Sequence, residues 1–200
     1  MSTIPLNLES DIVVLPYPAL SQHLSLDQAF KKRCSTRAFL DDTLTLDAMS
    51  ALLWAAFGVN REQQGGRTAP SAHDWKEIDI YVVLAEGAYR YEPRMHRLLL
   101  VRAEDVRKCA GTQDFVAAAP VNLVYVADLA RMVEVREEDR PFLAGADAGC
   151  IAQNVYLYCA AAGLATVVRA LIDRRRLAHA LGLPINQRIT LAQTVGYAKL

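Results

Sequence analysis

Hydrophobic positions recur with two periods along the chain, and each change of period marks an element. Apolar residues three or four positions apart predict amphipathic helices over 25–35, 45–58 and 140–162, the last being the longest. Ser25 and Thr45 are suited to cap the first two. Alternating or continuous β-branched runs predict largely buried strands at 78–84, 120–127, 164–168 and 189–195.

The segments between these elements complete the predicted order. A hairpin-like crossing at 87–93 leads to an apolar run at 98–101, and shorter helical patterns occupy 104–109, 113–118 and 174–181. Residues 1–24 hold three prolines without a helical period, which predicts an extended N-terminal arm in front of a single domain over 25–200. Strands and helices mix without a regular βαβ alternation, so the predicted class is α+β.

Composition limits the possible partners. The chain is 52% hydrophobic and 22% charged, which is typical of a folded protein, and its 22 Lys and Arg balance its 22 Asp and Glu. The chain therefore has no net positive charge that would favour binding to nucleic acid or an anionic membrane, and any anion-binding site must be local. Residues 1–10 lack the basic and apolar parts of a signal peptide, and the apolar stretch 150–168 is interrupted by polar residues and Gly163. We expect a cytoplasmic protein with no membrane partner.

The usual catalytic signatures are missing from the sequence. The four cysteines (Cys34, Cys109, Cys150 and Cys159) have no CxxC spacing, so we expect them to be reduced. The four histidines are scattered, which argues against a metal site. No dinucleotide-binding glycine motif, Walker loop, HExxH or GxSxG occurs. This absence suits an organic cofactor that brings its own reactivity.

Two stretches could hold such a cofactor. Residues 65–75 are rich in Gly, Ala, Ser and Pro, so their backbone could approach a flat ligand, although an ordinary surface turn fits equally well. Arg33, Ser35 and Arg37 follow the first predicted helix and could clamp a phosphate. The alternative is a solvated basic helix end, because Lys31 and Lys32 precede them and cations favour helix C-termini.

Several motifs, taken in order, resemble the nitroreductase family of FMN-dependent oxidoreductases. The similarity extends from about Leu26 to the end of the chain and is greatest to the short single-domain members, including those related to the thiazole/oxazole-forming dehydrogenases. It is carried by residues 33–39 (RCSTRAF), 53–61 (LWAAFGVNR), 66–72 (GRTAPSA), 145–154 (GADAGCIAQN), 163–168 (GLATVV) and 193–197 (QTVGY).

The resemblance implies a central, mostly antiparallel sheet flanked by helices, in an intertwined homodimer with two FMN sites at its interface. The side chains of Arg33 and Ser35, with the Cys34 amide, would hold the FMN phosphate. Arg37 would reach the N1/C2=O edge of the ring and act electrostatically. No side chain is expected to be catalytic, because the flavin performs the chemistry.

Further contacts are implied by the same resemblance. Val168, Arg169 and Ala170 would pass the N5/C4=O edge of the ring with their backbone. A loop of the partner subunit would line the ring through Pro70, Ser71, Ala72, His73 and Asp74. The chain departs from the family pattern at Cys34, where a second Arg is common, and at Asp74, where an amide side chain is frequent. Lys199 is the candidate for a basic residue that many members carry near the C-terminus.

The implied activity is reduction of FMN by NAD(P)H, followed by reduction of a nitroaromatic, quinone or similar small acceptor in a ping-pong scheme. Two alternatives remain: a flavin-dependent dehydrogenase or oxidase of a heterocyclic or peptide-derived substrate, and a flavin-binding protein without turnover. The small residues of 140–162 predict that this helix lies in the dimer interface, with Ala148 as a test position, although contact with another helix of the same chain is the alternative.

Overall fold

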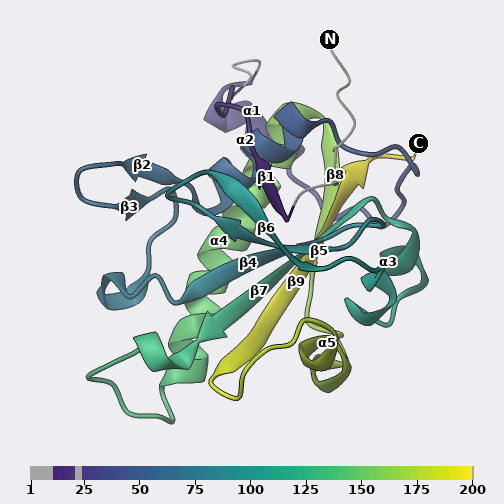
Figure 1. Cartoon of the computed structure of the whole chain (residues 1–200). Helices are drawn as coiled ribbons and strands as arrows, with labels where there is room; N and C mark the ends of the chain where they lie inside the picture. The colour runs from purple at the N-terminus through teal and green to yellow at the C-terminus, as the bar shows by residue number, and fades with distance from the viewer. Residues whose placement is uncertain (1–10, 21–23, 200) are drawn as a thin grey trace.

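A seven-stranded antiparallel sheet forms the centre of the molecule (Figure 1), and the computed structural model describes residues 11–20 and 24–199. The strand order across the sheet is β1-β6-β5-β4-β7-β9-β8. The strands are β1 (Ile12–Val14), β4 (Ile78–Val83), β5 (Ala88–Glu92), β6 (Arg97–Arg102), β7 (Val121–Asp128), β8 (Leu164–Arg169) and β9 (Gln187–Tyr197). A separate hairpin joins β2 (Val59–Arg61) to β3 (Gly66–Arg67).

Helices cover both faces of this sheet. One face carries α2 (Leu46–Phe57) and α4 (Arg140–Ala162), with α1 (Leu26–Lys32) against α4, and the other carries α3 (Asp114–Ala118) and α5 (Arg174–Ala180). Single 3₁₀ turns occupy η1 (Ala72–Asp74), η2 (Arg107–Cys109) and η3 (Leu129–Arg131). Ser25 forms a capping box with Gln28, Thr45 caps α2, and Gly163 ends α4 in the left-handed conformation.

Side chains along the central strands point alternately to the two faces of the sheet, which divides the hydrophobic core into two parts. Ile80 and Val82 of β4 point to the face covered by α2 and α4, whereas Tyr81 and Val83 point to the face covered by α3 and α5. The neighbouring strand β7 alternates in the same way. The predicted α+β class and the antiparallel sheet are confirmed.

Two local predictions need correction, and one element was missed. Residues 104–109 form only the 3₁₀ turn η2, because the Asp105 carboxylate accepts hydrogen bonds from the Arg107 amide and guanidinium and competes with a helix. The β2–β3 hairpin was not predicted, since its strands are too short to show a period. β9 begins at Gln187, two residues before its apolar run.

Part of the predicted N-terminal arm joins the sheet. β1 pairs with β6 at the edge of the sheet. Residues 1–10 and 21–23 of the arm lie outside the described residues, as does residue 200. Among the described residues, none of the helices has the length and apolar character needed to cross a membrane.

Candidate functional site

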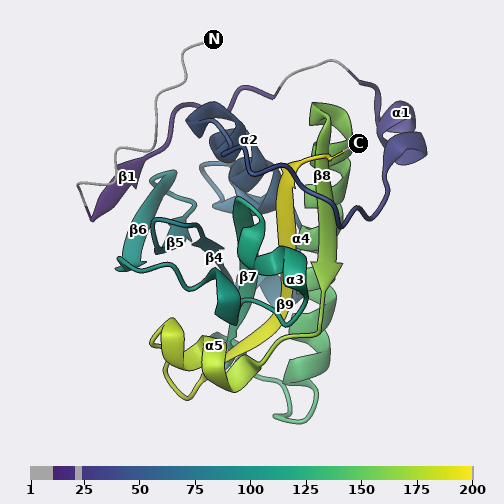
Figure 2. The same cartoon turned by 90° about the vertical axis from the view of Figure 1, so that its right-hand side faces the viewer.

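The segment that follows α1 lies against the edge strand β8 and the end of β9 (Figure 2). The Thr36 amide donates to the Thr166 carbonyl at 3.0 Å, and the Lys199 amide donates to the Ala38 carbonyl at 3.1 Å. Phe39 adds an isolated bridge to Ala198. These contacts place the predicted phosphate residues, the strand that ends in residues 168–170, and Lys199 at one edge of the sheet.

Tyr156 of α4 connects this segment to β8. Its hydroxyl lies 2.7 Å from the Ser35 hydroxyl and accepts a hydrogen bond from the Val168 amide at 3.0 Å. The Arg33 guanidinium lies over its ring, 5.3 Å from the centroid. Arg33, Ser35 and Val168 therefore lie together around Tyr156, and their role in binding a cofactor stays a prediction. Tyr156 itself was missed, because its position on α4 has the helical spacing of an ordinary core residue.

The cations of this cluster have no anionic partner in the described part of the chain. Arg33 and Arg37 form no ion pair there, whereas the nearby Lys31 is paired with Asp27 at 2.7 Å. The backbone amides of Cys34 and Ser35 also have no protein acceptor among the described residues. Cys34, Ser35 and Arg37 are exposed. Two guanidinium groups, a hydroxyl and two amides are thus available to an anion at this edge.

The second predicted part of the site, residues 70–74, is held by carboxylates. The Ala72 amide donates to the Asp147 carboxylate at 2.8 Å. The Ser71 hydroxyl donates to Glu77 at 3.0 Å and accepts from the Lys76 amide at 2.9 Å. These bonds fix the base of the loop.

The tip of the loop is exposed and conformationally unusual. His73 and Asp74 have φ angles of +50° and +57°, which non-glycine residues seldom adopt, and both are exposed, as is Pro70. The His73 ring stacks on Trp75 with centroids 4.5 Å apart. The carboxylate anchors at the base hold a strained tip outward.

Glu77 is a buried acid. Its side chain is fully buried, and Oε1 receives no hydrogen bond from the described residues. Burial, helped by the negative charge of Asp147, raises the pKa of this carboxyl to about 7, although the hydrogen bonds that it accepts act in the opposite direction. Near neutral pH the Glu77–Asp147 pair can therefore carry a proton.

Within one chain the two parts of the predicted site are separate. Asp147 and Tyr156 are nine residues apart on α4, which corresponds to about 13 Å at 1.5 Å per residue. In Figure 1 the segment between β3 and β4 projects on the left, whereas the C-terminal end of β9, beside which residues 33–40 run, is on the right. The partner-subunit origin of residues 70–74 stays a prediction.

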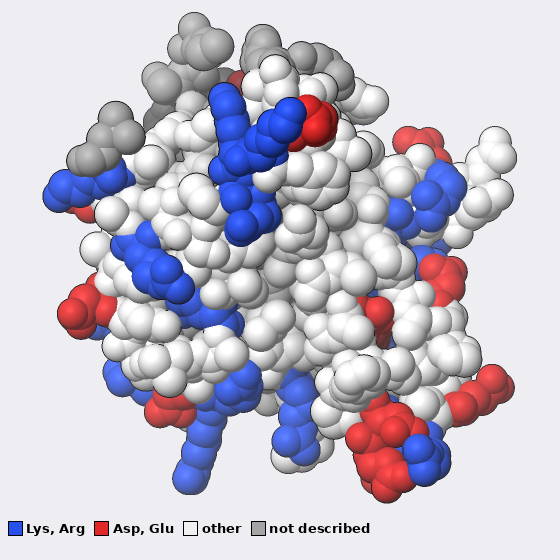
Figure 3. Space-filling model, turned by 180° about the vertical axis from the view of Figure 1, so that it is seen from behind, with Lys and Arg blue, Asp and Glu red and all other residues white. Residues whose placement is uncertain are grey.

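The exposed face of α4 differs from the one we predicted. Ala148 is fully buried in the core of its own chain, so a Glu at this position would test folding rather than an interface. The exposed positions of α4 are Pro141, Phe142, Ala146, Gly149, Cys150 and Gln153. From 148 to 162 the helix has no charged residue. Figure 3 shows the side of the molecule on which α4 lies, with a broad uncharged area bordered by charged side chains.

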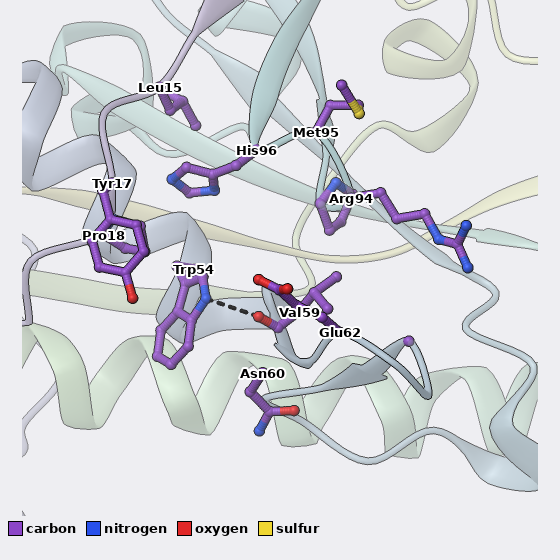
Figure 4. A pocket seen from close by; sticks show the side chains of 12 residues that line it. Leu15, Tyr17, Pro18, Trp54, Val59, Asn60, Glu62, Arg94, Met95 and His96 are labelled. Atoms are coloured by element: carbon purple, nitrogen blue, oxygen red, sulfur yellow. Dashed lines mark hydrogen bonds between the residues drawn. The ribbon is translucent and has the colours of Figure 1, made fainter.

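A hollow of about 790 Å³ lies between the N-terminal segment, the end of α2 and the β5–β6 turn (Figure 4). Tyr17, Trp54 and His96 surround it, and the Trp54 indole donates to the Val59 carbonyl at 3.1 Å. His96 lies 2.7 Å from the Ser50 hydroxyl, and burial lowers its pKa. None of the predicted cofactor residues lines this hollow. In the described part of the chain, no group of three or more His, Cys, Asp or Glu could hold a metal ion.

Comparisons with known proteins address the family. The sequence model described as "Nitroreductase family" matches residues 30–197. A provisionally named nitroreductase of Methanocaldococcus jannaschii is 34% identical over 157 residues, covering 73% of this chain and 78% of the relative.

Solved structures agree with this match. The crystal structure of a provisionally named nitroreductase from Ralstonia eutropha JMP134 is 44% identical, with a TM-score of 0.92 over 97% of this chain and 92% of that one. The NADPH:FMN oxidoreductase from Vibrio harveyi, complexed with NAD+, has a TM-score of 0.67 over 88% of this chain and 69% of its own. It is 19% identical, so this likeness concerns the fold alone.

Proposed function

The chain belongs to the nitroreductase family, and we propose that it is a homodimeric FMN-dependent oxidoreductase of the cytoplasm. NAD(P)H would be the electron donor, and a nitroaromatic, quinone or similar small molecule the acceptor, each using the same face of the flavin in turn. Residues 25–200 would form the FMN-binding domain, with 1–24 as an extended arm. The Vibrio harveyi protein of similar fold is named for NADPH and FMN, which supports this class of reaction.

One observation carries the proposal: in the described part of the chain, no carboxylate pairs with the anion-binding groups beside β8. Arg33 and Arg37 lack carboxylate partners in the described chain, and Ser35 and two backbone amides are available beside them. This donor set fits a terminal phosphate, which binds through guanidinium, hydroxyl and amide groups. It does not resemble a glycine-rich pyrophosphate site, so FMN fits better than FAD.

The remaining proposed roles follow the chain's own geometry. Arg33, Ser35 and the Cys34 amide would bind the phosphate, and Arg37 would stabilise negative charge on the ring. Lys199 is a second exposed cation near this segment, since its amide bonds to Ala38. Val168 and Ala170 would present backbone to the ring edge, and Arg169 would hold this end of β8 through its buried side chain.

The bound FMN supplies the group that accepts and donates electrons, and the protein supplies binding, orientation and electrostatics. The loop of the partner subunit, from Pro70 to Asp74, would cover the ring and exclude water from one side. Its anchors, Asp147 and Glu77, are already formed within each chain. The dimer would therefore assemble two preformed parts of each site.

The absorption spectrum of the purified protein, followed by chromatography of the flavin released on denaturation, tests the cofactor. FMN supports the proposal, whereas FAD or no flavin after reconstitution contradicts it. Stopped-flow mixing with NADH and with NADPH then tests the reaction. Fast loss of the oxidised flavin band supports the reductase. Bound FMN that neither nucleotide reduces favours a dehydrogenase or a non-catalytic flavin protein.

A further inference from the structure

Arg169 carries a positive charge inside the protein without a carboxylate beside it. The residue is 5% exposed. Its Nε donates to the Thr194 hydroxyl at 3.0 Å, Nη1 to the Ala110 carbonyl at 2.9 Å, and Nη2 to the Asn122 side-chain oxygen at 2.9 Å. All three acceptors are neutral. Among the described residues Arg169 forms no ion pair.

The surroundings of the guanidinium are built to hold it. Asn122 of β7 and Thr194 of β9 are fully buried and directly paired in the sheet. The Thr194 hydroxyl also donates to the Asn122 oxygen at 2.8 Å. A Cβ at Gly111 would lie 2.1 Å from Nη1, so the absence of a side chain there leaves the space that the guanidinium occupies.

The charge is retained at neutral pH despite its cost. Burial lowers the pKa of Arg169 to about 10, which still leaves it protonated at pH 7. A buried cation that is stabilised only by neutral dipoles is less favourable than an apolar residue in the same space. Such groups concentrate where a protein uses the charge.

The position of Arg169 in β8 suggests where this charge is used. The preceding residue, Val168, turns its amide to the outer edge of the strand, where Tyr156, Ser35 and Arg33 meet. Arg33 and Arg37 at this edge also lack anionic partners in the described chain. The Arg169 guanidinium lies behind this edge, on the face of the sheet that carries α3, against Ala110 and Phe115. Its charge can therefore act on a group bound at the edge through the field alone, without contact.

We propose that Arg169 is an electrostatic residue of the redox site, whose buried charge raises the reduction potential of the flavin bound at this edge. The inference rests on the proposed function. A hydride from NAD(P)H brings two electrons and one proton, so the flavin gains one negative charge while the nicotinamide is oxidised to NAD(P)+. A cation nearby stabilises that added charge without touching the reacting atoms.

The test compares the affinity of each variant for oxidised and for reduced FMN and measures the midpoint potential with the site saturated. Arg169→Met removes the charge and keeps an unbranched side chain. At a separation of about 10 Å and an effective dielectric constant near 20, the attraction between the Arg169 charge and the negative charge of the reduced flavin would favour the reduced form about tenfold. We expect the preference for reduced FMN to fall about tenfold, which lowers a two-electron potential by about 30 mV.

Two further variants separate charge from packing. Arg169→Lys keeps the charge, so its preference should stay within about twofold of the parent. Asn122→Asp keeps Arg169 but gives its guanidinium a carboxylate partner, so the preference for reduced FMN should fall as in Arg169→Met. This variant tests the inference if Arg169→Met does not fold. Thr194→Val, which removes one neutral acceptor, should leave the potential unchanged.

The outcomes also distinguish the two proposals. If Arg169→Met or Asn122→Asp binds FMN with the midpoint potential of the parent protein, this inference is wrong and the proposed function still stands. A parent protein that binds no flavin overturns both. A lower potential in both neutralised variants, with Arg169→Lys and Thr194→Val unchanged, supports the role assigned to Arg169.

Discussion

Two positions on α4, one toward each end of the helix, each hold an irregular loop, but with opposite chemistry. Toward the C-terminal end, Tyr156 uses a neutral hydroxyl to hold Ser35 and Val168, and the cations Arg33 and Arg37 remain without anionic partners in the described chain. Near the N-terminal end, the carboxylate of Asp147 binds a backbone amide directly. One end keeps its charge available for a ligand, and the other uses its charge to fix the backbone.

This contrast indicates how a dimer could complete the site. In a two-fold interface, residue i of one copy meets residue j of the other, and j meets i. If α4 packs antiparallel against its copy, the carboxylate-held loop of one chain approaches the cationic segment of its partner. Gly149 and Gln153, exposed between the two ends, would then lie close to the axis.

The largest effect should come from a charge placed between the two ends. Gly149→Glu should weaken dimer association more than about a hundredfold, because two like charges would be brought together in an uncharged interface. A Cβ at Gly149 meets no atom within 4 Å in its own chain, so each chain should still fold. Analytical ultracentrifugation measures the association.

Ala118→Glu is the matched control for this substitution, since it adds the same charge on α3, on the opposite face of the sheet, at another exposed position. It should remain dimeric. A parent protein that is monomeric, or a Gly149→Glu variant with the parent dimer affinity, would show that this face of α4 is not the interface.

At the cationic end, Arg33→Ala should weaken FMN binding about ten- to a hundredfold, the loss of a charge-assisted bond worth roughly 1.5–3 kcal/mol. Lys32→Ala removes an equal charge from the same helix end and should change the affinity less than about threefold, because only Arg33 lies over Tyr156. Fluorescence titration of FMN measures both. Equal losses would mean that the segment acts only through net charge.

At the carboxylate end, stability should depend on pH through Glu77. Its pKa is about 7 in the folded chain against 4.5 when unperturbed, so the folded state binds more protons between these values. The parent should therefore lose stability as pH rises through this window, by up to roughly 2–3 kcal/mol. Glu77→Gln removes the titrating group, so it should be more stable than the parent at pH 8 and similar at pH 5.

Urea unfolding at both pH values measures this difference. Glu62→Gln, an exposed position in the turn between β2 and β3, is the control and should unfold like the parent at each pH. The assignment of the proton to Glu77 is wrong if Glu77→Gln shows the parent's full loss of stability between pH 5 and pH 8.

The smallest effect is expected for the neutral anchor. Tyr156→Phe leaves the Val168 amide and the Ser35 hydroxyl without this partner, which should lower the free energy of unfolding by about 0.5–1.5 kcal/mol, equally at pH 5 and pH 8. Tyr158→Phe is the control, since its hydroxyl makes only a 3.5 Å contact with the Ala48 carbonyl. If the loss of stability in Tyr156→Phe differed between pH 5 and pH 8, the contrast between a neutral and a titrating anchor on α4 would be wrong.

Sequence alone determined the elements and the chemistry of the short motifs. Periodicity placed α2, α4 and the central strands, because the spacing of apolar residues is a local property. The Arg33–Arg37 segment was identified as a candidate anion site because its donors are only a few residues apart. The family resemblance rested on motifs of the same kind, and the family is confirmed.

Tertiary structure decided which distant residues meet. Tyr156 lies 121 residues from Ser35, and Asp147 lies 75 from Ala72, so no local pattern could pair them. The orientation of α4 was equally hidden: small apolar residues occur all round it, and only packing on the sheet shows that Ala148 is inside and Gly149 outside. From the sequence, Arg169 is predicted only to be a charged residue near the end of a strand. Its burial among neutral dipoles arises because β7, β9 and the loop at Gly111 converge on it in the folded chain.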